Sequence, residues 1–65
     1  MPSEVRFALV RAMLEKAGWT LSRINGSHHQ FTKAGERTLV IPVHRGKVKP
    51  GYVREIQKLI AKNEA

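Results

Sequence analysis

The residues with the clearest capacity for chemistry lie together in the stretch Gly26-Ser27-His28-His29. This stretch holds two of the three histidines in a chain of 65 residues that has no cysteine and no aspartate. Histidine titrates near neutral pH, so its imidazole can accept or donate a proton during a reaction. General acid–base catalysis by a histidine is therefore the first chemistry to consider, and the elements around the stretch decide which histidine is available for it.

A metal site is disfavoured by the residue types and their spacing. Neighbouring residues on a strand point to opposite faces and cannot converge on one ion, and the chain offers no thiolate ligand. Two-metal nuclease sites need clustered carboxylates, whereas the glutamates here are spread singly along the chain. A phosphate-binding P-loop and a serine nucleophile elbow are also absent from the sequence. We therefore expect neither a metal nor another cofactor.

The charge of the chain indicates an anionic partner. Lys and Arg number 12 against 5 acidic residues, giving a net charge of +7 and a positive field that reaches roughly one Debye length, ~8 Å, from the surface. No apolar run approaches the ~20 residues that cross a bilayer, and no secretory segment follows Met1. We expect a soluble, cytoplasmic protein without a membrane partner, forming one domain over residues 1–65 with a small core.

Two amphipathic helices are predicted, one on each side of the central stretch. Over residues 3–17, apolar residues recur three and four positions apart, and the buried stripe comprises Val5, Leu9, Val10, Met13, Leu14 and Ala17. Ser3 is the predicted N-cap, Glu4 lies in the first turn, and Gly18 ends the helix. The second helix is predicted from Pro50 to about residue 62, with a buried stripe formed by Val53, Ile56, Leu59 and Ile60.

Three strands are predicted between the helices, over residues 19–24, 28–33 and 37–43. Asn25-Gly26 is a tight-turn signal, and Pro42 indicates that the third strand ends there or lies at the edge of the sheet. Alternation divides the first strand between two faces, with Trp19 and Leu21 on one and Thr20, Ser22 and Ile24 on the other. The order α-β-β-β-α predicts an α+β fold with both helices packed on one face of a three-stranded antiparallel sheet.

Alternation along the second strand separates the two adjacent histidines. Phe31 is the expected core residue, and it shares its face with His29 and Lys33. His28 then lies on the open face, where it is available for chemistry, although an exposed histidine can also be a plain polar surface residue. His29 is expected to be half-buried beside Phe31 and hydrogen-bonded to the backbone.

Three blocks of residues resemble a known family. They are the helix end Leu14-x-Lys16-x-Gly18-Trp19, the stretch Gly26-Ser27-His28-x-x-Phe31, and the run Pro42-x-His44-x-Gly46-Lys47-x-Lys49-Pro50-Gly51. Together they resemble the HicA family of toxins from bacterial and archaeal toxin-antitoxin pairs, small mRNA interferases with a fold similar to the double-stranded RNA-binding domain. The resemblance implies that His28 is the catalytic histidine, that Gly26 and Ser27 shape its turn, and that His29 has no inherited role. It also implies a cognate antitoxin, similar to the HicB family, that masks the site.

The chemistry expected of His28 is cleavage of mRNA without a metal ion. Removal of the proton from a 2′-hydroxyl lets that oxygen attack the adjacent phosphorus, leaving a 2′,3′-cyclic phosphate. A second proton-transfer group is needed, and His44, Tyr52 and water all remain open, since His44 could equally serve to order the loop over residues 44–49. The rival interpretations are a non-catalytic double-stranded RNA-binding module and an adaptor for an acidic protein.

Cations that could hold the RNA phosphate groups precede the second helix. Lys47 and Lys49 are the main candidates, because free backbone N–H groups and the helix dipole favour an anion there. Further candidates for the same surface are Arg23, Lys33, Arg37 and Arg45. The alternative interpretation is that the two lysines are solvated residues of a flexible loop.

Overall fold

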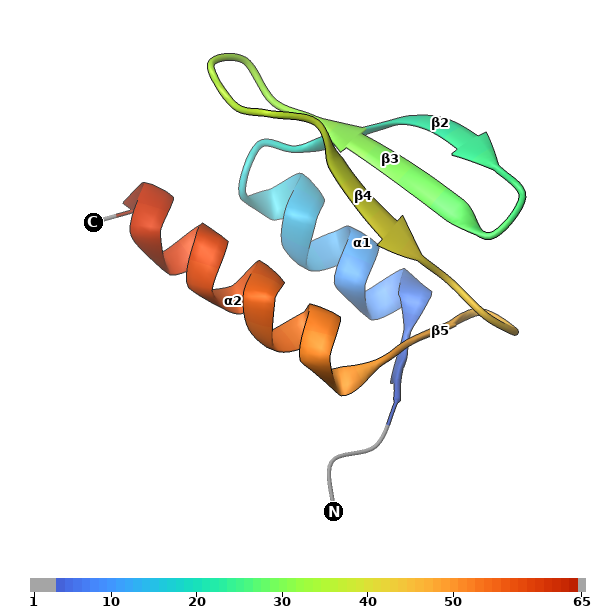
Figure 1. The fold of residues 1–65 in the computed structure, drawn as a ribbon. Helices are drawn as coiled ribbons and strands as arrows, with labels where there is room; N and C mark the ends of the chain where they lie inside the picture. Colours follow the sequence, from blue (N-terminus) through green and yellow to red (C-terminus); the bar gives the residue numbers. More distant parts are fainter. Residues whose placement is uncertain (1–3, 65) are drawn as a thin grey trace.

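The computed structural model describes residues 4–64 of the chain, with side chains for residues 4–62. The elements, in chain order, are β1 (Val5–Arg6), α1 (Phe7–Lys16), β2 (Thr20–Asn25), β3 (His28–Thr32), β4 (Leu39–Pro42), β5 (Lys47–Val48) and α2 (Pro50–Glu64). Strands β2, β3 and β4 form an antiparallel sheet in that order, and both helices lie on one side of it (Figure 1). The predicted α+β fold is confirmed, and the pair β1–β5 forms a second, two-stranded sheet that was not predicted.

The start of α1 differs from the prediction. The helix begins at Phe7, and Val5 is instead part of the extended strand β1, directly opposite Val48 of β5. Val48 is fully buried, so Val5 packs on the core from a strand rather than from a helical turn. Apolar spacing cannot reveal this pairing, because the two residues are far apart in the sequence.

The first turn of α1 is capped by backbone rather than by a side chain. The N–H of Phe7 donates a hydrogen bond to the carbonyl O of Gly46 at 2.7 Å, and Arg6 at the N-cap position makes no side-chain cap. The predicted N-cap, Ser3, lies outside the described residues, and Glu4 precedes β1 instead of lying in the first turn. Because a distant carbonyl already accepts this helix N–H, no Ser, Thr or Asp side chain is needed at the N-cap position to accept it.

The end of α1 follows the prediction closely. Gly18 takes φ 96° directly after the helix, and its N–H donates to the carbonyl O of Glu15 at 3.0 Å. The N–H of Trp19 donates to the carbonyl O of Leu14 at 2.9 Å, so the two bonds form a Schellman motif. Trp19 and Leu14 are both buried, which adds the hydrophobic contact that accompanies this motif.

The buried face of α1 is narrower than predicted. Val10 and Leu14 are fully buried and Phe7 packs against the core, whereas Leu9 is 59% exposed. Successive helical residues are about 100° apart, so a face centred on Val10 and Leu14 leaves Leu9 at its margin. The stripe predicted for α2 is confirmed, with Val53 and Ile56 buried and Leu59 and Ile60 packed against the core.

A two-residue turn joins β2 to β3 at the end of the sheet where His28 lies. Asn25 pairs with His28, and Gly26 takes φ 62° at the first of the two central positions, where a type II′ hairpin turn requires glycine. Pro42 is the last residue of β4, an edge strand, as predicted. The connection over residues 33–38 lies at the opposite end of the sheet (Figure 1).

A β-bulge in β2 changes which side chains share a face. Leu21 pairs with Phe31, but Arg23 pairs with Gln30, so Ser22 is an extra residue on this strand. Because directly paired residues lie on the same face, Arg23 and Gln30 are together on the open face. Beyond the bulge, the alternation of β2 is therefore inverted.

The bulge overturns the predicted position of Ile24. Ile24 pairs with His29, so it lies on the helix side of the sheet and not on the open face with Thr20. It is 57% exposed, since it is close to the end of the hairpin. Strict alternation failed here because one inserted residue moves every later side chain to the other face.

Candidate functional site

His28 is the first residue of β3 and follows directly on the Gly26-Ser27 turn. It pairs with Asn25 on one side and Pro42 on the other, and it is exposed on the face of the sheet that carries no helix. Phe31 is fully buried on the opposite face, so the expected separation of these two residues is confirmed. Within the described chain, the His28 imidazole makes no hydrogen bond, which leaves both ring nitrogens accessible.

His29 lies on the helix side of the sheet and is half-buried, as expected. Its Nδ1 lies 3.3 Å from the carbonyl O of Ser27. Its ring packs on that of Phe7, with centroids 4.5 Å apart and the planes inclined by 56°. Phe7 falls in the interior of the helix predicted over residues 3–17, whereas it is the first residue of α1, so its place beside His29 was not expected.

Residues 44–47, which lie in the loop expected over residues 44–49, form a second tight turn. His44 and Lys47 exchange two backbone hydrogen bonds of 3.0 and 2.9 Å. Arg45 takes φ 53° and Gly46 takes φ 74°, so both central residues are left-handed, as in a type I′ turn. Arginine disfavours this conformation, so the turn stores backbone strain of about 1 kcal/mol at Arg45.

The two turns lie at the same end of the sheet. Pro42 is directly opposite His28, and the N–H of Val43 donates to the carbonyl O of Ser27 at 2.7 Å, which extends the pairing past the end of β4. His44 follows two residues after Pro42, about 7 Å further along an extended chain. The structure therefore brings the exposed side chains of His28 and His44 to one region.

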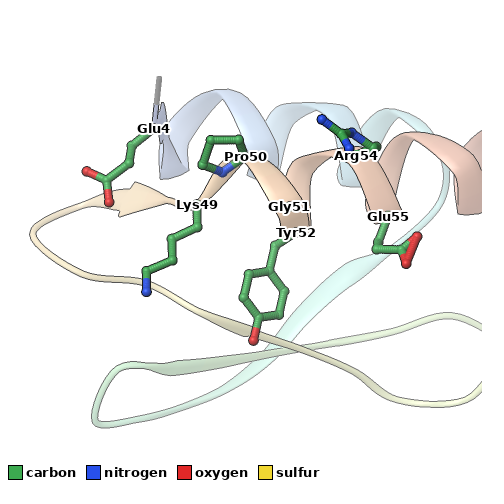
Figure 2. Close-up of a pocket in the computed structure, with 7 residues that line it drawn as sticks. All are labelled: Glu4, Lys49, Pro50, Gly51, Tyr52, Arg54 and Glu55. Carbon is green, nitrogen blue, oxygen red and sulfur yellow. The ribbon is translucent and has the colours of Figure 1, made fainter. Parts of the chain in front are cut away.

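Tyr52 lies in the first turn of α2. It lines an open hollow of about 760 Å³ at the start of α2, together with Glu4, Lys49, Pro50, Gly51, Arg54 and Glu55. In Figure 2 the Tyr52 ring and the Lys49 side chain extend in the same direction from this end of the helix. Neither His28 nor His44 lines the hollow.

The predicted phosphate-binding cations divide into two groups. Arg23 is on the open face with His28, Arg45 is in the second turn, and Lys47 is in β5 next to that turn. Lys49 is exposed immediately before α2. The other group, Lys33 and Arg37, is at the opposite end of the sheet.

Lys33 has a structural partner. Its Nζ donates to the carbonyl O of Ala17 at 2.8 Å, at the C-terminal end of α1, and the side chain is half-buried. An ammonium at this position satisfies a free helix carbonyl and complements the helix dipole. Lys33 is therefore not part of the surface around His28.

Arg6 is a cation that the sequence reasoning missed. It falls within the helix predicted over residues 3–17, but β1 places it directly opposite Lys47 of β5. Like charges that face each other across two strands repel, so a bound anion would relieve this contact. No local signal could have indicated Arg6, because the β1–β5 pairing joins distant parts of the chain.

The positive charge around the two turns is not neutralised within the described chain. The two ion pairs found there are both within helices, Arg11 Nε to Glu15 Oε2 at 3.0 Å in α1 and Lys58 Nζ to Glu55 Oε2 at 4.0 Å in α2. Over residues 4–64, no three side chains of metal-binding type come close enough to hold an ion, and no helix is long and apolar enough to cross a membrane. The cations are thus available to an external anion.

The fold and this surface define a class of small, basic α+β proteins that present one histidine at a hairpin turn among unpaired cations. The family model described as the HicA toxin of bacterial toxin-antitoxin matches residues 9–62. The chain therefore belongs to the HicA toxin family, and as the toxin of a pair it implies a cognate antitoxin as partner. A comparison with curated proteins gives no significant match.

Proposed function

We propose that this toxin is an endoribonuclease that cleaves mRNA, an mRNA interferase, with His28 as its catalytic histidine. One observation carries the proposal: an exposed histidine follows a tight turn on the open sheet face, at the end of the sheet where Arg23, Arg45 and Lys47 have no ion-pair partner within the described chain. The cytoplasm, where mRNA is translated, is the compartment in which it would act. Gly26 allows the turn, and Ser27 supplies the backbone that precedes His28.

The reaction uses the RNA as its own source of nucleophile. His28 takes the proton from a 2′-hydroxyl, the 2′ oxygen bonds to the adjacent phosphorus, and the bond from phosphorus to the 5′ oxygen breaks. The products are a 2′,3′-cyclic phosphate and a 5′ end that must receive a proton to become a hydroxyl. His44 is the proposed donor of that proton, because it lies at the same end of the sheet as His28.

The RNA backbone is held by the cations around the two turns. Arg23 approaches from the open sheet face, and Arg45 and Lys47 approach from the second turn, with Lys49 further along the chain. The facing pair Arg6 and Lys47 gains most from a phosphate, because the two charges otherwise repel each other. These cations also offset the charge that develops on the phosphorane oxygens during attack.

The cognate antitoxin is proposed to be similar to the HicB family and to inhibit the toxin by covering the open face of the sheet. An acidic surface on the antitoxin would complement the net charge of +7 and would compete with RNA for the same cations. The purified pair should then neither bind nor cleave RNA. Unchanged activity in the complex would contradict this mode of inhibition.

The proposal is tested with the purified toxin and a labelled single-stranded RNA oligonucleotide. Cleavage should continue in the presence of a chelator, and a DNA oligonucleotide of the same sequence should remain intact because it lacks the 2′-hydroxyl. His28→Ala should lower the cleavage rate by ~100- to 10,000-fold. Full activity of a folded His28→Ala protein, or equal cleavage of the DNA, would contradict the mechanism.

The same assay separates the rival functions. A non-catalytic double-stranded RNA-binding module would bind a duplex and release it uncut. An adaptor for an acidic protein would show no RNA affinity at low salt, where the electrostatic contribution is largest.

A further inference from the structure

Phe7, the first residue of α1, contacts the second turn of the candidate site directly and is linked to the first turn through His29. Its backbone N–H donates to the carbonyl O of Gly46, in the second turn, at 2.7 Å. Its ring packs on the His29 ring with centroids 4.5 Å apart. His29 Nδ1 lies 3.3 Å from the carbonyl O of Ser27, in the first turn. A continuous series of contacts therefore joins the two turns through Phe7 and His29.

These contacts converge on the carbonyl O of Ser27. The N–H of Val43, the residue before His44, also donates to this oxygen, at 2.7 Å. A carbonyl oxygen has two lone pairs and can accept both hydrogen bonds, with His29 donating through Nδ1–H. The peptide unit that contains this carbonyl is the one between Ser27 and His28, and it is planar. Holding its oxygen therefore fixes the direction in which the backbone enters His28.

We propose that His29 is a positioning residue, whose hydrogen bond to the carbonyl O of Ser27 holds the peptide before His28 and so aims the His28 imidazole. This inference rests on the proposed function, in which His28 is the catalytic histidine. Proton transfer depends on placing the base within hydrogen-bonding reach of its proton, so a small displacement of the turn lowers the rate without changing RNA affinity. A residue that only filled the core would affect stability and leave the rate per folded molecule intact.

Two variants separate the hydrogen bond from the packing. His29→Phe keeps a ring against Phe7 and removes the donor, whereas His29→Asn removes the ring but retains an amide N–H near the position of Nδ1. The matched control is Ser22→Ala, which removes another side-chain bond to a backbone carbonyl in the same hairpin, from Ser22 Oγ to the carbonyl O of Gln30 at 3.2 Å.

The rate is measured in single turnovers, with the toxin in saturating excess over a labelled RNA oligonucleotide, at a temperature where circular dichroism shows every variant folded. The dissociation constant is measured with the same RNA carrying 2′-O-methyl groups, which prevent cleavage. We expect His29→Phe to react about five- to tenfold more slowly, the rate equivalent of one net hydrogen bond, with the dissociation constant unchanged. His29→Asn and Ser22→Ala should react within about twofold to threefold of the unmodified protein.

Two results would overturn the inference. A His29→Phe protein as fast as the unmodified one would show that the hydrogen bond positions nothing. A His29→Asn protein as slow as His29→Phe would assign the effect to ring packing instead.

The proposed function can fail separately. If the unmodified toxin does not cleave RNA, hydrogen exchange of the Val43 amide still tests the positioning role, because this N–H donates to the same Ser27 oxygen. Faster exchange in His29→Phe than in Ser22→Ala would support the role, and equal exchange would refute it.

Discussion

The two ends of β3 each carry a basic side chain, and the two side chains have opposite environments. His28 begins the strand, is exposed on the open face and makes no hydrogen bond through its ring within the described chain. Lys33 follows the end of the strand, is half-buried on the helix side and donates to the carbonyl O of Ala17 at 2.8 Å. The fold thus uses the cation at one end of the strand to complete its own helix and leaves the group at the other end free for a ligand.

The largest expected effect on activity comes from substituting His28, the exposed residue that begins β3. His28→Ala should reduce RNA cleavage by ~100- to 10,000-fold, since it removes the proposed general base. The free energy of unfolding should change by no more than about 0.5 kcal/mol, because the side chain is exposed and has no partner. Urea denaturation and the RNA cleavage assay on the same preparation measure both quantities. A strong loss of stability would mean that His28 supports the fold, as Lys33 does, and is not free for a ligand.

Lys33→Met should show the reverse pattern. Methionine keeps an unbranched apolar side chain and loses the ammonium that caps α1, so the free energy of unfolding should fall by about 1–2 kcal/mol. With the toxin in saturating excess over RNA, the cleavage rate per folded molecule should be unchanged, because this end of the sheet is remote from His28. Urea denaturation and single-turnover cleavage test this prediction, and a slower rate with intact stability would break the distinction between the two ends.

The smallest effect is expected from the strained turn. Arg45→Asn should raise the free energy of unfolding by up to about 1 kcal/mol, because asparagine tolerates the left-handed conformation that Arg45 adopts at φ 53°. The same change should weaken RNA binding and reduce the salt dependence of affinity by about 0.7 in the slope of log K against log salt, the contribution of one phosphate contact to a single strand.

Arg37→Asn is the matched control, because it removes the same charge at the opposite end of the sheet. It should leave the salt dependence almost unchanged. Binding titrations with 2′-O-methyl RNA at several KCl concentrations compare the two variants. Equal slopes for the two variants would show that RNA affinity depends on the overall charge of the protein and not on the cations around the two turns.

Local patterns allowed part of the fold to be predicted. Gly18 ends α1 as expected, since a left-handed residue after a helix favours glycine whatever the rest of the chain does. The opposite faces of His28 and Phe31 were also predictable, because alternation along a strand needs only one buried residue to set its phase. Both signals lie within a few residues of the feature that they predict.

The errors share a different origin. The helix start was placed too early because Val5 suits a helical stripe as well as it suits a strand, and only its pairing with Val48 decides between them. Residues 44–47 were expected to lie in a loop of no particular structure before the second helix, but they form a tight turn whose Gly46 carbonyl accepts a hydrogen bond from the N–H of Phe7. In both cases the deciding contact joins segments that are far apart in the sequence, and a local pattern cannot reveal such a contact.

The sequence by itself determined the identity of the candidate histidine and the face on which it lies, because both follow from the period of a strand anchored by Phe31. Only the tertiary structure decided what surrounds it. Strict alternation from Leu21 would have turned Arg23 toward the helices, and the bulge at Ser22 places it on the open face instead. The positions of Arg6, His44 and Lys47 likewise depend on hydrogen bonds between distant strands, whose register is set by the packing of the whole chain.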